Sequence, residues 1–247
     1  MSSGPLFGVS TYRSVNALNS VNKLIERSLE RLSSGYRVNS AADDPAGSPV
    51  ATHFSTRARS GNQAIRNINN GISMAQVAEG AMSEVGNILD RMRELAFQSA
   101  SDTLSSSQRS SIDDEFEELS AEVDRIASAS EYNDIQLTDG TVSDIDVQVG
   151  TGSGSSSQVT IELGDITANT LGVDTAAIDL STSSGASAAI TAIDSAIDNV
   201  NGQVSSIGSS QNRLDSASSY MSSYVTAMES AHSSIMDADI AHETAEL

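Results

Sequence analysis

The segment that decides the fold is residues 29–47, which reads LERLSSGYRVNSAADDPAG. Before and into this segment, apolar side chains recur at steps of three and four, the spacing of one helix face: Leu18, Val21, Ile25, Leu29 and Leu32. Gly35 ends that pattern. Beyond it, Ser40, Asp43 or Asp44 can cap a new helix, and Pro45 suits a first helical turn because an N–H there would have no helical partner. The segment therefore predicts a joint between two helices.

Two long apolar seams follow the joint, with a shorter one between them. The first runs from residue 46 to residue 100 in steps of three and four, as in a coiled coil, and includes Ile65, Ile68, Ile72, Met82, Leu89 and Met92. A short stripe from Ile112 to Ile126 precedes the last seam, between residues 187 and 240, which includes Ile190, Ile193, Ile197, Val200 and Leu214. Gln211 is the polar member of that seam and could fix its register. These seams predict the core of a helical bundle.

The periodicity changes to alternation between residues 131 and 172. Two short runs place apolar residues at every second position, and a Gly/Ser-rich stretch separates them: Ile145, Val147 and Val149, then Val159, Ile161 and Leu163. This pattern predicts a β-hairpin with a loose tip.

The predicted fold is mainly α, an elongated antiparallel bundle of long N- and C-terminal helices with a small β-hairpin region at the far end. The expected segments are residues 1–44 for the first helix and joint, 45–130 for the first half of the helical core, 131–180 for the hairpin region and 181–247 for the second half.

Composition limits the function. The 247 residues carry 33 acidic and 13 basic side chains, a net charge of −20, and this sign disfavours nucleic acid and anionic membranes as partners. The sequence has no cysteine, which excludes disulfides and thiolate metal sites. No apolar run approaches the roughly 18 to 20 residues of a membrane span, and the first thirty residues lack the apolar core of a signal peptide.

Catalytic patterns are incomplete. His242 and Glu243 lack the second histidine of a HExxH zinc site, and the glycines of residues 150–154 lack the lysine that follows a phosphate-binding loop. No histidine or acid is placed to activate a serine. We expect no enzyme activity, no cofactor and no metal.

Several motifs resemble those of one family. The quoted joint resembles the N-terminal signature of bacterial flagellins, RLSSG-x-R-x-NSAxDD-x-AG. Further flagellin-like sequence motifs follow in the family's order: NNGISMAQVAEGAMSEV, ILDRMRELAFQSA, QNRLDSA and MDADIAHETAEL. The long central insertion of many flagellins is absent between these motifs, and from the resemblance we expect a form without the family's further amphipathic helix after residue 247. The resemblance implies a core-only subunit that self-assembles with other flagellin subunits into the extracellular flagellar filament used for motility.

The resemblance also implies partners. Flagellins leave the cell by the flagellar type III pathway, without a cleavable signal peptide, and contact an export chaperone and the export apparatus. In flagellins of this type, the helix carrying the RELA-like text and the acidic helix after it contact Toll-like receptor 5 of the host. The matching positions are Arg91, Leu95 and Glu115. The other interpretation of these residues is that Leu95 flanks the core seam and that Arg91 pairs with a neighbouring acid.

Two other functions fit the same pattern. A hook–filament junction protein shares the helical layout that the resemblance implies. A secreted coiled-coil adhesin is the alternative from a different class, although only the short hairpin is available as a folded insertion. Self-assembly discriminates between them, because a flagellin forms long filaments whereas an adhesin remains a discrete oligomer.

Overall fold

A computed structural model describes residues 6–246, and the side chains of residues 11–245. In chain order the elements are α1 (Leu6–Ser34), α2 (Gly47–Ser99), α3 (Ser106–Ala129), β1 (Glu131–Tyr132), β2 (Ile135–Gln136), β3 (Asp144–Gln148), the short 3-10 helix η1 (Ser155–Ser157), β4 (Gln158–Glu162), α4 (Ala168–Leu171), α5 (Ser183–Met236) and α6 (Ile240–Glu246). The predicted mainly α fold with long helices is confirmed.

The chain divides into two compact units. One comprises residues 1–62 and 223–247, and the other comprises residues 63–222. Helices α2 and α5 contribute to both units. The four segments expected from sequence stay a prediction, since these compact units cut across both long helices.

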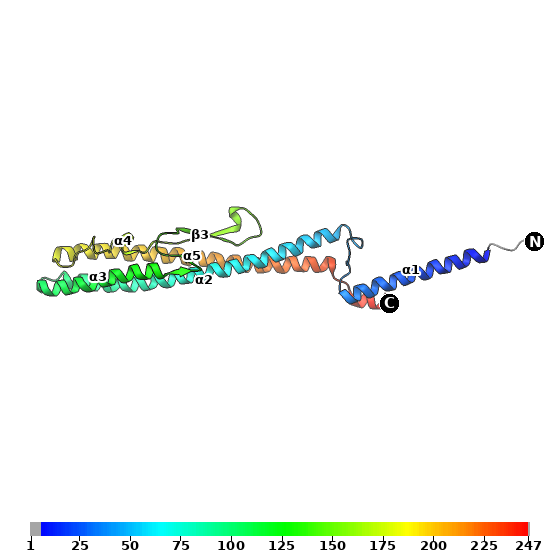
Figure 1. Cartoon of the computed structure of the whole chain (residues 1–247), viewed down its shortest axis with the longest axis horizontal. Helices are drawn as coiled ribbons and strands as arrows, with labels where there is room; N and C mark the ends of the chain where they lie inside the picture. Colours follow the sequence, from blue (N-terminus) through cyan, green and yellow to red (C-terminus); the bar gives the residue numbers. More distant parts are fainter. Residues whose placement is uncertain (1–5, 247) are drawn as a thin grey trace, which may run out of the picture. The chain divides into compact units, whose positions relative to one another are not determined.

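The 63–222 unit contains the main hydrophobic core. There α3 returns along α2, and α5 lies beside them (Figure 1). The largest fully buried side chains come from all three helices and from the segment between them: Ile68, Met82, Leu89, Met92, Leu95, Phe116, Leu137, Ile161, Ile166, Leu180, Ile193 and Ile207. The small buried residues Ala75, Ala78, Ala96, Ala189 and Ala196 allow the helices to approach closely.

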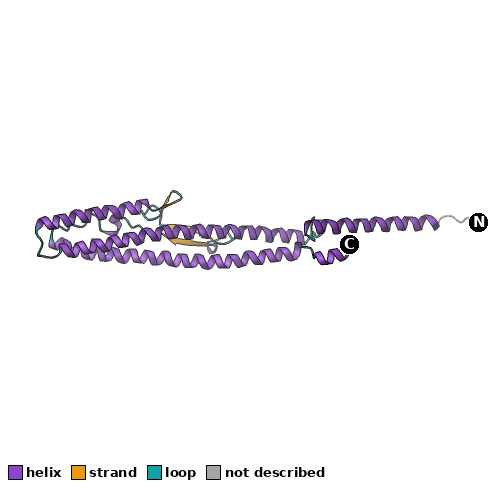
Figure 2. Ribbon diagram, turned by 90° about the horizontal axis from the view of Figure 1, so that it is seen from below, coloured by secondary structure: helices purple, strands orange, loops and turns teal. Residues whose placement is uncertain are grey.

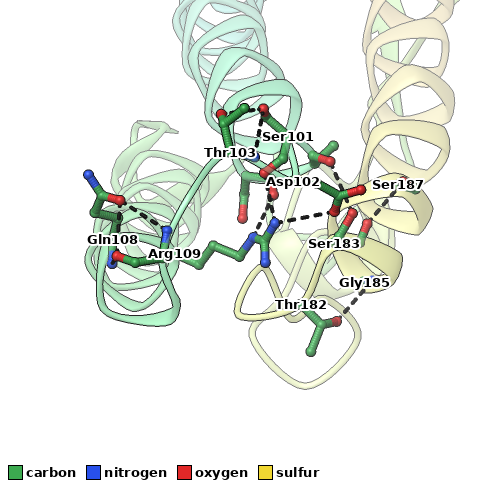
Figure 3. Close-up of polar contacts among 12 residues, drawn as sticks. Ser101, Asp102, Thr103, Gln108, Arg109, Thr182, Ser183, Gly185 and Ser187 are labelled. Atoms are coloured by element: carbon green, nitrogen blue, oxygen red, sulfur yellow. Dashed lines mark hydrogen bonds and ion pairs between the residues drawn. The ribbon is translucent and has the colours of Figure 1, made fainter.

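One end of this unit is closed by a polar turn between α2 and α3 (Figure 3). Ser105 and Gln108 form a reciprocal capping box at the start of α3. The guanidinium of Arg109 donates from Nε to the Ser99 carbonyl (3.0 Å) and from Nη2 to the Ser101 carbonyl (2.7 Å). Ser183 Oγ donates to the Ala100 carbonyl (3.0 Å). Carbonyls that α2 leaves unpaired at its C-terminus are thus satisfied by α3 and α5.

The β-hairpin pairs as predicted but lies elsewhere. Strands β3 and β4 are antiparallel, with Ile145 opposite Ile161 and Val147 opposite Val159. The expectation that the hairpin lies at the far end is wrong: Figure 2 shows the strands alongside the helices, and a Cβ added at Gly71 would lie 2.8 Å from Cγ2 of Val147. Helix α3 explains the difference, because its 24 residues carry the chain back by about 36 Å before the strands begin.

Two smaller elements escaped the sequence patterns. Strands β1 and β2 form a tight hairpin whose turn residues, Asn133 and Asp134, both have positive φ. Asn and Asp tolerate this conformation better than most residues, so the Asn-Asp pair was the available signal. Helix α4 spans one turn and ends at Gly172 in the left-handed conformation. Neither element is long enough to show a period.

The predicted joint is confirmed in the other unit. Gly35 has φ +76°, and its N–H donates to the Arg31 carbonyl, which ends α1. The carboxylate of Asp44 accepts from the Gly47 N–H at 2.7 Å and caps α2, whereas Asp43 accepts from the Ser40 N–H at 2.8 Å and closes the preceding turn.

The joint is tied to the chain that follows α5. Arg37 donates its N–H to the Met236 carbonyl at 2.6 Å, and Ala238 donates its N–H to the Gly35 carbonyl at 2.9 Å. Tyr36 and Asp237 pair as an isolated antiparallel bridge between them. This short backbone pairing follows the end of α5 at Met236, a few residues before residue 240, where the predicted seam region ends.

Candidate functional site

The main candidate surface is the apolar stripe of α1. Among the side chains that the structure describes, half of the exposed large hydrophobic residues lie on this one helix: Tyr12, Val15, Leu18, Val21, Leu24, Ile25 and Leu29. Leu18 is 61% exposed and Leu24 is 59% exposed. Five of them, Val15, Leu18, Val21, Ile25 and Leu29, fall within about 120° around the helix, with Tyr12 and Leu24 on either side. Apolar side chains gathered in this way normally pack against another element. An uncovered stripe of this kind therefore marks an interaction surface.

Helix α6 packs on the last turns of α1 without covering that stripe. Arg31 Nη1 lies 2.9 Å from Glu243 Oε1, and Glu243 is only 4% exposed. The hydrogen bond from Arg31 holds the pKa of the Glu243 carboxyl below its usual range, and Ser28 adds a second hydrogen bond. This contact was not predicted, because the sequence around Glu243 shows only an incomplete zinc motif.

The residues predicted to form the core seam lie in the 63–222 unit. Seven are buried: Ile68, Met82, Leu89, Met92, Ile193, Val200 and Leu214. Ile72, Ile190 and Ile197 are partly buried against the same core, and Ile65 is half-buried. Gln211 donates from Nε2 to Glu79 Oε2 at 2.8 Å, which gives the polar seam position a partner on the facing helix.

The structure brings together only two of the three predicted receptor contacts. Arg91 forms ion pairs with Glu115 (2.7 Å) on α3 and with Glu94 (2.9 Å) on its own helix. Its side chain is 50% exposed and that of Glu115 is 46% exposed. These bonds to Glu115 and Glu94 raise the pKa of the Arg91 guanidinium above its usual range.

Leu95 does not belong to this exposed pair. It is 1% exposed and lies in the core cluster with Ile88 and Phe116, so its expected role as an exposed apolar anchor is corrected. The reason is that α3 covers a second face of α2, which buries a column of apolar side chains beside the predicted seam. The geometry at Leu95 and Arg91 corresponds to the alternative interpretation, a buried leucine beside a paired arginine.

Within residues 6–246, no group of three or more His, Asp or Glu side chains is placed to hold a metal ion. None of the described helices is long and apolar enough to cross a membrane.

Comparison with known proteins identifies the family. Residues 9–143 match the bacterial flagellin N-terminal helical region, and residues 190–247 match the bacterial flagellin C-terminal helical region. A flagellin of Halalkalibacterium halodurans is 37% identical over 221 residues, which cover 90% of this chain and 80% of that protein. The chain belongs to the bacterial flagellin family. It is a structural protein of the flagellar filament, an extracellular assembly of flagellin subunits, and not an enzyme.

Other relatives show which part of a flagellin is present. Flagellin B of Vibrio anguillarum is 40% identical over 162 residues, but the aligned region spans only 43% of that protein. The two matched flagellin regions of this chain are separated only by residues 144–189. The predicted core-only form without a middle domain is therefore confirmed.

Solved structures agree with this assignment. The crystal structure of Bacillus cereus flagellin is 30% identical, with a TM-score of 0.56, and covers 63% of this chain and 88% of its own. A putative flagellar hook-associated protein from Vibrio parahaemolyticus has a TM-score of 0.66 at 19% identity and covers 79% of this chain and all of its own. The second likeness concerns the fold alone.

Proposed function

We propose that this flagellin joins its filament through the apolar stripe of α1, which packs against helices of other subunits. The observation that carries the proposal is the exposure of that stripe, whose members are uncovered in the described chain. Burying it would remove several leucine and valine side chains from water, each worth roughly 1.5 to 3 kcal/mol when fully buried. This gain in free energy favours association of α1 with another subunit over its exposure to water.

The stripe can be tested with a double substitution. Leu18→Ser with Leu24→Ser should abolish filament formation while the melting temperature of the monomer stays near that of the wild type, because both side chains are already exposed. Sedimentation and electron microscopy measure assembly, and circular dichroism measures melting. Ile135→Ser, at an exposed apolar position in β2, is the matched control and should assemble normally. Wild-type filament yield from the double variant would refute the proposal.

A hook–filament junction protein remains the second candidate function. The flagellin identity of 37% over most of the chain, against 19% to the hook-associated structure, favours the filament subunit. The two differ in assembly, since a filament subunit adds repeatedly to its own kind. Growth of long filaments from purified protein on flagellar seeds supports the filament subunit, and a single terminating layer supports the junction protein. A discrete soluble oligomer would instead support the coiled-coil adhesin.

Family membership also supports a route out of the cell. We infer export through the flagellar type III apparatus with the help of an export chaperone. Secretion of this flagellin should stop in cells that lack the export ATPase and continue in cells that lack the general secretory signal peptidase. Secretion that follows the opposite pattern would exclude this route.

Recognition by Toll-like receptor 5 is a further part of the proposed function. In this proposal Arg91 and Glu115 supply charged contacts at an exposed surface, without Leu95. Exposed ion pairs contribute only about 0 to 1 kcal/mol to folding, so Arg91→Asp should leave melting nearly unchanged and weaken receptor binding to the folded monomer. Arg125→Asp, which breaks the exposed Arg125–Glu122 pair on α3, is the control. Equal receptor affinity of the two variants would remove Arg91 from the site.

A further inference from the structure

We propose that the ion pair between Arg31 and Glu243 is a registry pin: it holds α6 at one position on α1 and so fixes how the apolar stripe is presented to a second copy of this chain. The inference rests on the proposed self-assembly through that stripe. Arg31 and Glu243 act in it as positioning residues, because neither belongs to the stripe itself.

The pair is unusually well shielded for this chain. Its side chains are 25% and 5% exposed, whereas each of the other described ion pairs has at least one partner that is 46% exposed or more. Ser28, one helical turn before Arg31, is 9% exposed and hydrogen-bonds to the same carboxylate. The carboxylate is therefore shielded from water between α6 and α1.

The buried ion pair contributes little to the strength with which α6 is attached to α1. Removing two charges from water costs about as much as their attraction returns unless every polar atom is satisfied. Here Arg31 Nε and Glu243 Oε2 are buried and have no hydrogen-bond partner in the described chain. The apolar side chain at the start of α6, Ile240, is 46% exposed, so it is not what holds this helix. Two well-packed apolar residues would attach α6 at least as firmly.

A buried charge pair instead provides positional specificity. If α6 packed on α1 with its register shifted by one residue, its carboxylate would lie about 1.5 Å further along the α6 axis and about 100° around that axis. Such a shift would leave both charges buried and unpaired. Apolar contacts tolerate such slips, but this contact does not. The best-supported use of a buried polar pair is to fix the register of packed helices.

The pin lies away from the central line of the stripe, on the side of α1 that also carries Val21 and Leu24. At 100° per residue, Ser28 and Arg31 lie roughly 80° and 140° around α1 from the line through Leu18, Ile25 and Leu29. Leu29 remains 52% exposed next to the docked α6. The helix is thus held on one side while Leu24 and Leu29 both stay exposed.

The backbone gives the pin a second fixed point. Ala238 donates its N–H to the Gly35 carbonyl, and Arg37 donates its N–H to the Met236 carbonyl, just before α6 begins. Together with the pin, this pairing attaches residues 236–243 to α1 and the joint at two places. One attachment alone would leave α1 free to rotate about its axis. Two attachments fix which way the stripe faces relative to residues 236–243.

The test measures the attachment of α6 to α1 separately from the stability of the whole fold. Glu243→Gln removes the charge and keeps the shape, and Arg31→Glu combined with Glu243→Arg exchanges the two charges. Hydrogen exchange of residues 240–246 is measured on the monomer, together with thermal melting, and filament order is measured by electron microscopy. Glu122→Gln, at an exposed ion pair of α3, is the matched control.

The pin predicts a specific combination of results. Glu243→Gln should lower the protection of residues 240–246 at least tenfold, leave the main melting transition in place, and give fewer or irregular filaments; the exchanged pair should recover both properties in part. Normal filaments from Glu243→Gln, or unchanged protection of α6, would overturn the proposal. If wild-type protein forms no filaments, the proposed function fails, yet the exchange measurement still decides whether the pair holds α6.

Discussion

At the scale of single residues, Glu243 shows why sequence alone underestimates a buried charge. Its neighbours in the chain are polar, and its partner Arg31 lies 212 positions away. Sequence periodicity reveals only contacts between residues that are close in the chain. From its sequence context, Glu243 was therefore expected to be a solvated surface glutamate. The contact arises only because the joint at Gly35 and the bridge at Asp237 bring the two segments together.

The same residue predicts a pH dependence. Arg31 and Ser28 lower the folded-state pKa of Glu243 below its ordinary value of 4.5, and His242 adds to the effect. A lowered pKa contributes stability that is present above the ordinary value and is lost as the pH falls through the folded-state value. Protection of residues 240–246 against hydrogen exchange, corrected for the intrinsic pH dependence, should therefore remain constant from pH 7 to pH 5 and fall in more acidic solution. Loss of protection already near pH 6 would instead implicate a histidine.

At the scale of elements, the long helices and the β3–β4 hairpin could be predicted because their periods are strict. The expected helix over residues 46–100 is observed as Gly47–Ser99, and the first helix as Leu6–Ser34. What failed concerned how elements meet. The position of the hairpin depends on how far α3 returns along α2, and the burial of Leu95 depends on α3 covering a second face. The apolar period of a single helix predicts neither feature, because both depend on how helices pack against one another.

The core seam gives a prediction at this scale. Leu89 is fully buried, so Leu89→Ala should cost about 2 to 5 kcal/mol of unfolding free energy through lost burial and the cavity that remains. Ile197 is only partly buried at the edge of the core, so Ile197→Ala should cost less than Leu89→Ala. Urea unfolding of both variants measures the difference. Equal costs would mean that burial does not distinguish these positions, and no cost at Leu89 would contradict the seam.

At the scale of the whole molecule, the charge is distributed very unevenly. Residues 63–222 carry 24 acidic and 6 basic side chains, a net charge of −18 out of the chain's −20. Four of the six basic residues, Arg91, Arg93, Arg109 and Arg125, already form ion pairs within the unit. The remaining acidic groups repel one another, and this repulsion opposes the compact state.

Salt should therefore stabilise this unit, although it weakens the ion pairs. Raising the ionic strength from about 0.1 M to about 1 M shortens the screening length from about 10 Å to about 3 Å, which reduces repulsion among many exposed carboxylates. The exposed ion pairs lose at most about 1 kcal/mol each, and there are few of them. Thermal melting followed by circular dichroism should shift to higher temperature with added NaCl. Replacing Glu117 and Glu118 of α3 by Gln should make that shift smaller, because both carboxylates are exposed within the acidic unit. A melting temperature that falls with salt would show that the ion pairs outweigh the net charge.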